Sequence, residues 1–183
     1  MSADAFATLG LPRRAALAET EIQTAYFSRS KEAGQDQESL NAAFQTLIAP
    51  EKRLKHLLEL AAPPEAKAWR AVVMPEELMR LFSKVGTLKA ESESLLKRRA
   101  AAGSALSKAL MEPLVLKLRE TGEEVAAQLA GELEQLAAGF AALDQAVEEG
   151  ADDAWNRVAA CQAHLAYLTK WQAQVRELLM GLM

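Results

Sequence analysis

The strongest constraint on the fold is the spacing of apolar residues in three long segments of the chain. In each segment these residues recur at steps of three and four, which places them on one face of an α-helix. Three long amphipathic helices with short connections predict an antiparallel bundle. The three sets are Leu78, Leu81, Phe82, Val85, Leu88, Leu95 and Leu96; Val125, Leu129, Leu133, Leu136, Phe140, Leu143 and Val147; and Val158, Cys161, Leu165, Leu168, Val175, Leu178 and Leu182.

The composition also favours helices. Half of the 183 residues are apolar and only 5% are aromatic. The apolar residues are mostly Ala and Leu, which form helices well and include few of the β-branched types that strands prefer. Such a chain can bury a core, and its composition argues against an all-β, collagen-like or disordered protein. We therefore predict an all-α fold.

Several classes of protein are disfavoured by charge and by cysteine content. One Cys excludes an internal disulfide and a multi-cysteine metal cluster. A formal net charge of -4 argues against a dedicated DNA-binding protein. No run of 18 apolar residues is present, and the start of the chain lacks the basic and apolar regions of a signal peptide. We expect a cytoplasmic protein with no nucleic-acid or membrane partner.

Prolines predict the domain organisation. Pro63, Pro64 and Pro75 fall in one stretch, and proline disfavours helix both at its own position and at the preceding residue. The predicted domains are residues 1–62, a linker over 63–75, and the helical bundle over 76–183. Gly150 predicts a further break before the last long helix.

Shorter helices are expected in the first domain. A segment from Asp4 to Leu9 ends at Gly10, and a second runs from Glu19 to about Ala33 before Gly34. A third periodic segment covers about residues 38–60. Pro50 should divide that segment into two helices, because proline fits the start of a helix better than its interior.

Charge is unevenly distributed in the bundle. Nine basic and three acidic residues lie between Arg80 and Arg119, whereas ten acidic residues and no basic one lie between Glu120 and Asp153. One interpretation is that neighbouring helices of opposite sign stabilise an antiparallel arrangement. The other is a charged surface that faces a partner.

Three motifs in the first domain occur in the order and spacing of a J-domain, the module with which co-chaperones engage a DnaK-type ATPase. They are Phe6-Ala7-Thr8-Leu9-Gly10-Leu11-Pro12, Glu21-Ile22-Gln23-Thr24-Ala25-Tyr26, and the run from Asn41 through Phe44 and Leu47 to Arg53. Over residues 4–60 the chain resembles the HscB family of iron–sulfur cluster co-chaperones. The resemblance implies a J-domain-like fold joined to a C-terminal three-helix bundle.

The motif that makes J-domains active is incomplete. The family carries His-Pro-Asp after its second helix, and the corresponding positions here are Gly34, Gln35 and Asp36. The second helix of active members is also strongly basic, whereas residues 19–34 carry a net charge of -1. The resemblance with these departures implies a degenerate J-domain that does not stimulate an ATPase in the usual way.

The C-terminal domain resembles the part of HscB proteins that binds the iron–sulfur scaffold protein. Leu78, Met79 and Phe82 occupy the apolar docking positions of the first bundle helix, and Tyr167 occupies the aromatic position of the last one. The family's acidic positions fall on Ser83, Gly86 and Ala90, so only the apolar half of the surface is kept. The alternative is that these apolar residues belong to the core.

Motifs for chemistry are absent from the sequence. His56 and His164 lack neighbours with metal-ligand spacing, so each is interpreted as a surface or packed histidine. Cys161 lies on an apolar helix face and is interpreted as a small buried hydrophobe. No phosphate-binding loop, nucleophile elbow or zinc-protease motif occurs. We expect no enzymatic activity, no cofactor and no metal.

The leading hypothesis is a non-enzymatic, co-chaperone-like protein-interaction module. The resemblance links it to iron–sulfur cluster assembly and implies a scaffold protein or a DnaK-type chaperone as partner. Two alternatives stay open: an active co-chaperone with a variant loop, and a structural helical protein that associates with itself. The client, the oligomeric state and the orientation of the two domains are not predicted.

Overall fold

The computed structural model describes residues 3–32, 34, 36–64 and 72–183, and this part of the chain consists of helices and their connections without a β-strand. The predicted all-α class is therefore confirmed. No helix among these residues combines the length and apolar character needed to cross a bilayer. The helices are α1 (Ala5–Leu9), α2 (Glu19–Ser30), α3 (Gln37–Ile48), α4 (Pro50–Ala61), α6 (Glu76–Ala101), α7 (Ala105–Ala109), α8 (Glu112–Ala138), α9 (Phe140–Glu148) and α10 (Ala154–Gly181).

Local signals set the bounds of the first helices. The Asp4 carboxylate accepts hydrogen bonds from the backbone N–H groups of Phe6 and Ala7 at the start of α1. Gly10 ends that helix with φ +71°, a left-handed conformation that glycine adopts without a Cβ penalty. Pro50 is the first residue of α4, which confirms the predicted division of that segment. The second helix is shorter than predicted and ends at Ser30, where the Lys31 N–H closes a tight last turn on Ser28.

The chain divides into two compact units. Unit 1 comprises Met1–Val72 and Gln135–Ala166, and unit 2 comprises Val73–Glu134 and Tyr167–Met183. These units differ from the predicted ranges 1–62 and 76–183, because residues 135–166 pack with the N-terminal helices. The domain boundaries derived from the prolines stay a prediction, since most of the predicted linker lies outside the described residues.

Unit 1 has a core of buried apolar side chains from α1, α3 and α4, with Phe6, Leu47 and Leu54 fully enclosed.

One feature differs from the sequence analysis: the periodic segment 125–147 is not one helix. It breaks at Gly139, which separates α8 from α9. The Gly139 N–H bonds to the Leu136 carbonyl in a tightened turn, and glycine stabilises a continuous helix poorly.

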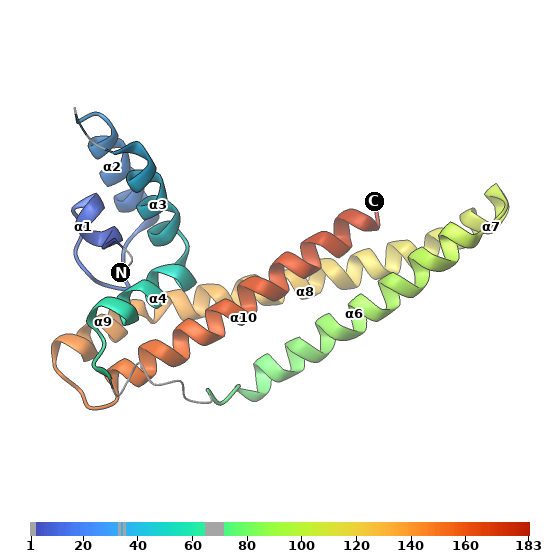
Figure 1. Ribbon diagram of the computed structural model, residues 1–183. Helices are drawn as coiled ribbons and strands as arrows, with labels where there is room; N and C mark the ends of the chain where they lie inside the picture. The colour runs from blue at the N-terminus through green and yellow to red at the C-terminus, as the bar shows by residue number, and fades with distance from the viewer. Residues whose placement is uncertain (1–2, 33, 35, 65–71) are drawn as a thin grey trace. The chain divides into compact units, whose positions relative to one another are not determined.

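Unit 2 is built from α6, α7, α8 up to Glu134 and the C-terminal part of α10 (Figure 1). The Lys84 side chain in α6 bonds to Gln128 in α8, and Arg99 bonds to Glu112, so these two helices run antiparallel. Pro113 lies in the first turn of α8, where proline is tolerated because the N–H that it lacks has no intrahelical partner there.

Close packing joins α8 to its neighbours at Gly122. A Cβ atom at this position would lie 2.7 Å from Leu179 Cδ2 of α10 and 3.6 Å from Leu88 Cδ2 of α6. Gly181 at the end of α10 lies beside Leu96 of α6. Both α6 and α8 continue past this level to α7, so the end of unit 2 at α7 has two long helices instead of three (Figure 1).

Candidate interaction surface

An aromatic cluster lies on unit 2 where α6 meets α10. The indole of Trp171 is buried, and it contacts the rings of Phe82 and Tyr167 at centroid distances of 5.5 and 6.0 Å. Phe82 is 52% exposed, Tyr167 45% and Met79 49%. We call Met79, Phe82 and Tyr167 the aromatic surface. Large apolar side chains that are exposed to solvent and supported by a buried residue are typical of a protein-interaction site.

Leu78 does not belong to this surface. The sequence predicts that Leu78 docks together with Met79 and Phe82, but its side chain is only 3% exposed and packs in the core of unit 2. The reason is helical geometry: Leu78, Leu81 and Val85 follow one buried stripe, whereas Met79 and Phe82 lie beside it. Of the four predicted docking residues, the structure brings Phe82 and Tyr167 together on Trp171, leaves Met79 exposed one turn before Phe82, and buries Leu78.

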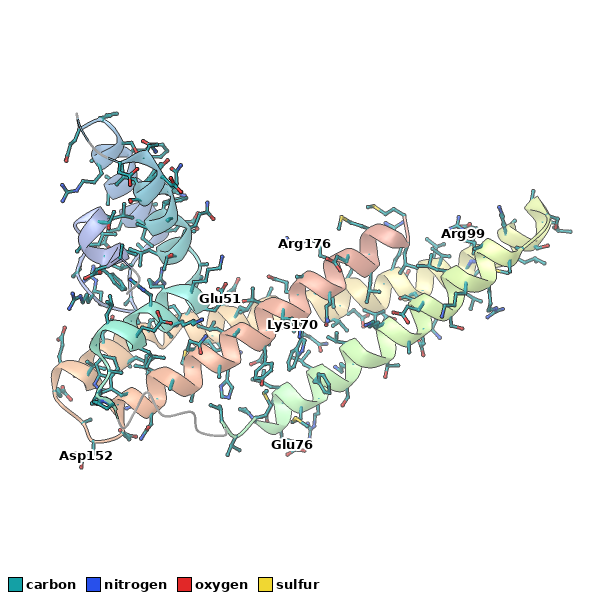
Figure 2. The ribbon with its side chains drawn as sticks, in the orientation of Figure 1. Glu51, Glu76, Arg99, Asp152, Lys170 and Arg176 are labelled. Atoms are coloured by element: carbon teal, nitrogen blue, oxygen red, sulfur yellow. The ribbon has the colours of Figure 1, made fainter. Side chains whose placement is uncertain are left out.

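Trp171 was missed by the sequence analysis, although it supports the aromatic surface. The available signal was its spacing: Trp171 follows Tyr167 by four residues, so both side chains lie on neighbouring turns of one helix face. Lys170, labelled in Figure 2, lies next to it in α10 and is exposed. Trp155, near the start of the same helix, is partly exposed and belongs to unit 1.

The predicted chaperone-loop positions follow α2. Gly34 is exposed with φ +83°, and no atom lies within 4 Å of the place where a Cβ would stand. Gln35 lies outside the described residues. The Asp36 carboxylate caps α3 by accepting hydrogen bonds from the Glu38 N–H, at 3.1 Å, and from the Ser39 hydroxyl. The bond from Ser39, and then that from Glu38, lowers the pKa of Asp36.

The motif residues of α2 and α3 form one polar and aromatic clamp. The Tyr26 hydroxyl donates to Asn41 Oδ1 at 2.7 Å, and the Gln37 amide donates to both Tyr26 and Asn41 at 3.0 Å. The ring of Tyr26 packs against Phe44 with a centroid distance of 4.7 Å. These residues hold α2 against α3, so the motifs that suggested the family have structural roles here.

The two histidines differ in their surroundings. His56 is buried, and its Nε2 accepts a hydrogen bond from the Ala5 N–H at 3.0 Å while its ring stacks on Phe6. It is thus a packed histidine that ties α4 to α1, one of the two roles considered from the sequence. His164 is half-buried on α10. No group of three or more His, Cys, Asp and Glu side chains among the described residues could hold a metal ion.

Cys161 is buried on α10, as predicted. Its burial raises the pKa of the thiol from 9.0 to about 11, because the low-polarity surroundings disfavour the thiolate. Since the thiolate is the reactive form, this cysteine is a packing group at neutral pH.

Arg53 and Asp144 make polar links in unit 1 that the sequence did not indicate. The buried Arg53 donates to the Leu47 carbonyl at 2.8 Å and lies over the ring of Phe140 in α9. Burial lowers the pKa of Arg53, and the charge of Asp144 opposes this shift. The two oxygens of Asp144 accept hydrogen bonds from the backbone N–H groups of Ala15 and Ala16, at 2.6 and 2.8 Å. Asp144 therefore attaches α9 to the segment that precedes α2.

Comparison with known proteins does not identify a family. No family model matches the chain, and no curated protein matches it.

Proposed function

We propose that this protein is a non-enzymatic, co-chaperone-like interaction module that works with an iron–sulfur scaffold protein. The single observation that carries the proposal is the aromatic surface. Met79, Phe82 and Tyr167 are about half exposed; the rings of Phe82 and Tyr167 lie against Trp171, and Met79 lies one helical turn before Phe82 on α6. Exposed aromatic groups on a rigid support make effective binding anchors, because little side-chain freedom is lost on docking.

The order of the sequence motifs supports the link to HscB-like co-chaperones. In this proposal residues 1–62 correspond to a degenerate J-domain and residues 76–183 to the C-terminal bundle. The capped helix before Gly10 and the clamp of Tyr26, Asn41 and Phe44 are consistent with a helical fold that uses these motifs for packing.

Binding to a purified iron–sulfur scaffold protein, measured by titration calorimetry, tests the aromatic surface. The variant Phe82→Ser with Tyr167→Ser should weaken binding at least about tenfold, since central aromatic anchors carry much of an interface's energy. Met180→Ser is the matched control, because Met180 lies on the same helix as Tyr167 and is 54% exposed. Equal affinity of the double variant and the wild-type protein would contradict the proposed docking surface.

The second part of the proposal is that the protein does not stimulate a DnaK-type ATPase through the usual loop. Asp36 is engaged as the cap of α3, and the positions before it provide neither the His nor the Pro of the family motif. Steady-state ATP hydrolysis by a purified DnaK-type chaperone should be the same with and without the protein. Robust stimulation that disappears in Asp36→Ala would instead support an active co-chaperone with a variant loop.

Restoring the motif provides a further test of the loop. Gly34→His with Gln35→Pro supplies the missing side chains, and the space around Gly34 is open. The positive φ of Gly34 disfavours a side chain there, so the loop must change its backbone to hold His. We expect little gain in ATPase stimulation, whereas a large gain would show that only these two residues separate the protein from an active J-domain.

A further inference from the structure

A second surface lies on unit 2, between α6 and α8 and towards their α7 ends. It is an open groove of about 470 Å³, and its lining residues come from α6 and α8 alone. Leu95, Leu114 and Leu118 supply apolar area, and Arg98 and Lys117 add positive charge. Glu91 is the acidic lining residue. The groove therefore fits an apolar partner that carries acidic groups.

The charges around this groove reverse sign along α8. Residues 97–119 contain six basic side chains and one acidic one, Glu112, which bonds to Arg99 at 2.8 Å. Arg99, labelled in Figure 2, lies towards the α7 end of α6. Residues 120–134 contain five acidic side chains and no basic one. Within the described residues no ion pair joins 80–119 to 120–153, so the first interpretation of the charge pattern receives no support from direct pairing.

The acidic half of α8 also repels itself. Glu120, Glu123 and Glu124 are exposed, and their spacings of three and four place like charges on adjacent turns. An exposed leucine lies on the Lys117 side of the helix: Leu114, which lines the groove, is 43% exposed. Both features are unfavourable in an isolated unit, and both would be relieved by a partner that brings basic and apolar side chains to α8.

A second copy of α8 could bring such basic and apolar side chains. Lys117 and Glu124 are seven residues apart, which is two helical turns, so they lie on the same face. If two copies of α8 cross antiparallel about a two-fold axis near Thr121, Lys117 of each copy lies opposite Glu124 of the other. Arg119 and Glu123 project from the opposite side of α8, roughly 200° and 240° around the helix from Lys117, and stay outside the interface. An interface of this kind is self-complementary and closes as a dimer.

We propose that unit 2 forms an antiparallel homodimer in which the basic groove of each copy receives the acidic part of α8 from the other. The occupant is a second copy because the same helix supplies both signs of charge, in the order that a two-fold axis requires. This inference does not rest on the proposed co-chaperone function, since it uses neither Met79 nor Phe82 nor Tyr167.

Sedimentation velocity on the full chain tests the dimer. At about 0.1 M salt we expect a concentration-dependent dimer, and at about 1 M salt a shift towards monomer, because the Debye length falls from about 10 Å to about 3 Å. A protein that stays monomeric at low salt up to high concentration would overturn the proposal. So would an open-ended series of larger species, because a two-fold interface cannot extend.

Charge reversal identifies the surface. The basic-to-acidic variant Lys117→Glu and the acidic-to-basic variant Glu124→Lys should each raise the dimer dissociation constant by about tenfold, because the two-fold axis makes each reversal act at both Lys117–Glu124 contacts. Mixed together, the two variants should form a heterodimer, since every opposed pair is again of opposite sign. Arg176→Glu on α10 is the control and should leave the dimer unchanged. This register would be refuted if neither reversal changed the dimer dissociation constant, or if the two variants formed no heterodimer on mixing.

A cross-link tests the axis without altering charge. Thr121→Cys should form a disulfide-linked dimer under mild oxidation, because the two Thr121 positions approach each other at the axis. Thr87→Cys, at an exposed site on α6, should not. The native Cys161 is buried and does not compete. Equal cross-linking of both variants, or none of Thr121→Cys, would contradict the proposed geometry even if a charge variant failed to fold.

Discussion

Replacing Asp144 by alanine should release residues 15 and 16 from α9. The Asp144 carboxylate accepts two backbone hydrogen bonds, from Ala15 at 2.6 Å and Ala16 at 2.8 Å, and nothing in the variant can replace it. Ala15 is fully buried, so its N–H would be left without a partner and shielded from water.

The size of the effect follows from these two bonds. A hydrogen bond to a charged group contributes about 1.5–3 kcal/mol. Asp144 is only half-buried, so water recovers part of the loss, and we expect about 2–3 kcal/mol for the pair of bonds together. At about 1.4 kcal/mol per factor of ten, the amides of Ala15 and Ala16 should exchange hydrogen roughly 30- to 150-fold faster.

Native-state hydrogen exchange is the suitable assay, since it reads stability amide by amide and does not require the whole chain to unfold in one step. Asp144→Asn keeps one acceptor oxygen without the charge, so its effect should be intermediate. Glu148→Ala, at an exposed site on the same helix, is the control and should change exchange at Ala15 by less than about threefold. If Asp144→Ala behaved like this control, the attachment of α9 through Asp144 would be refuted.

Three further predictions concern single positions. Gly122→Val should destabilise unit 2 by about 1–3 kcal/mol in urea titrations, because its Cβ alone would lie 2.7 Å from Leu179 Cδ2 and 3.6 Å from Leu88 Cδ2, and its methyl groups need further space; unchanged stability would contradict this close approach. Cys161 should react slowly with a thiol reagent at pH 8 in the folded protein and rapidly in the unfolded protein, since burial raises its pKa to about 11. The burial of the neutral thiol stabilises the fold below about pH 9, and this stabilisation is lost as pH rises towards 11. The lowered pKa of Asp36 implies stabilisation that is present above about pH 4 and lost as pH falls through its folded-state pKa. This pH dependence should be absent in Asp36→Asn and weakened in Ser39→Ala, which removes the largest cause of the lowered pKa and leaves the Glu38 bond.

Much of the helical structure was predictable because its signals are local. Asp4 and Gly10 bound α1, Pro50 begins α4, and the stripe of Leu81, Val85 and Leu88 is buried as its spacing predicted. These features depend on residues within one or two turns of one another, where backbone geometry and hydrogen bonding are decided by neighbouring side chains. The break at Gly139 was missed because periodicity continues across it and glycine alone does not end every helix.

The aromatic surface shows the limit of the same reasoning. Spacing placed Leu78, Met79 and Phe82 close together, but it could not tell which of them face a neighbouring helix. That distinction depends on where α10 packs, with Trp171 against Phe82. Residues at the border of the apolar face of a helix are buried or exposed according to the position of the helix that packs against that face.

The sequence by itself determined that this protein is helical, where several helices of the first domain begin and end, and which faces are apolar, because these properties arise from contacts between near neighbours. Only the tertiary structure decided which segments form each compact unit. Asp144 and Ala15 are 129 residues apart, and their bond brings α9 to the N-terminal helices. No local pattern encodes such a pair, since its energy is gained only after the intervening chain has folded and brought the two groups together.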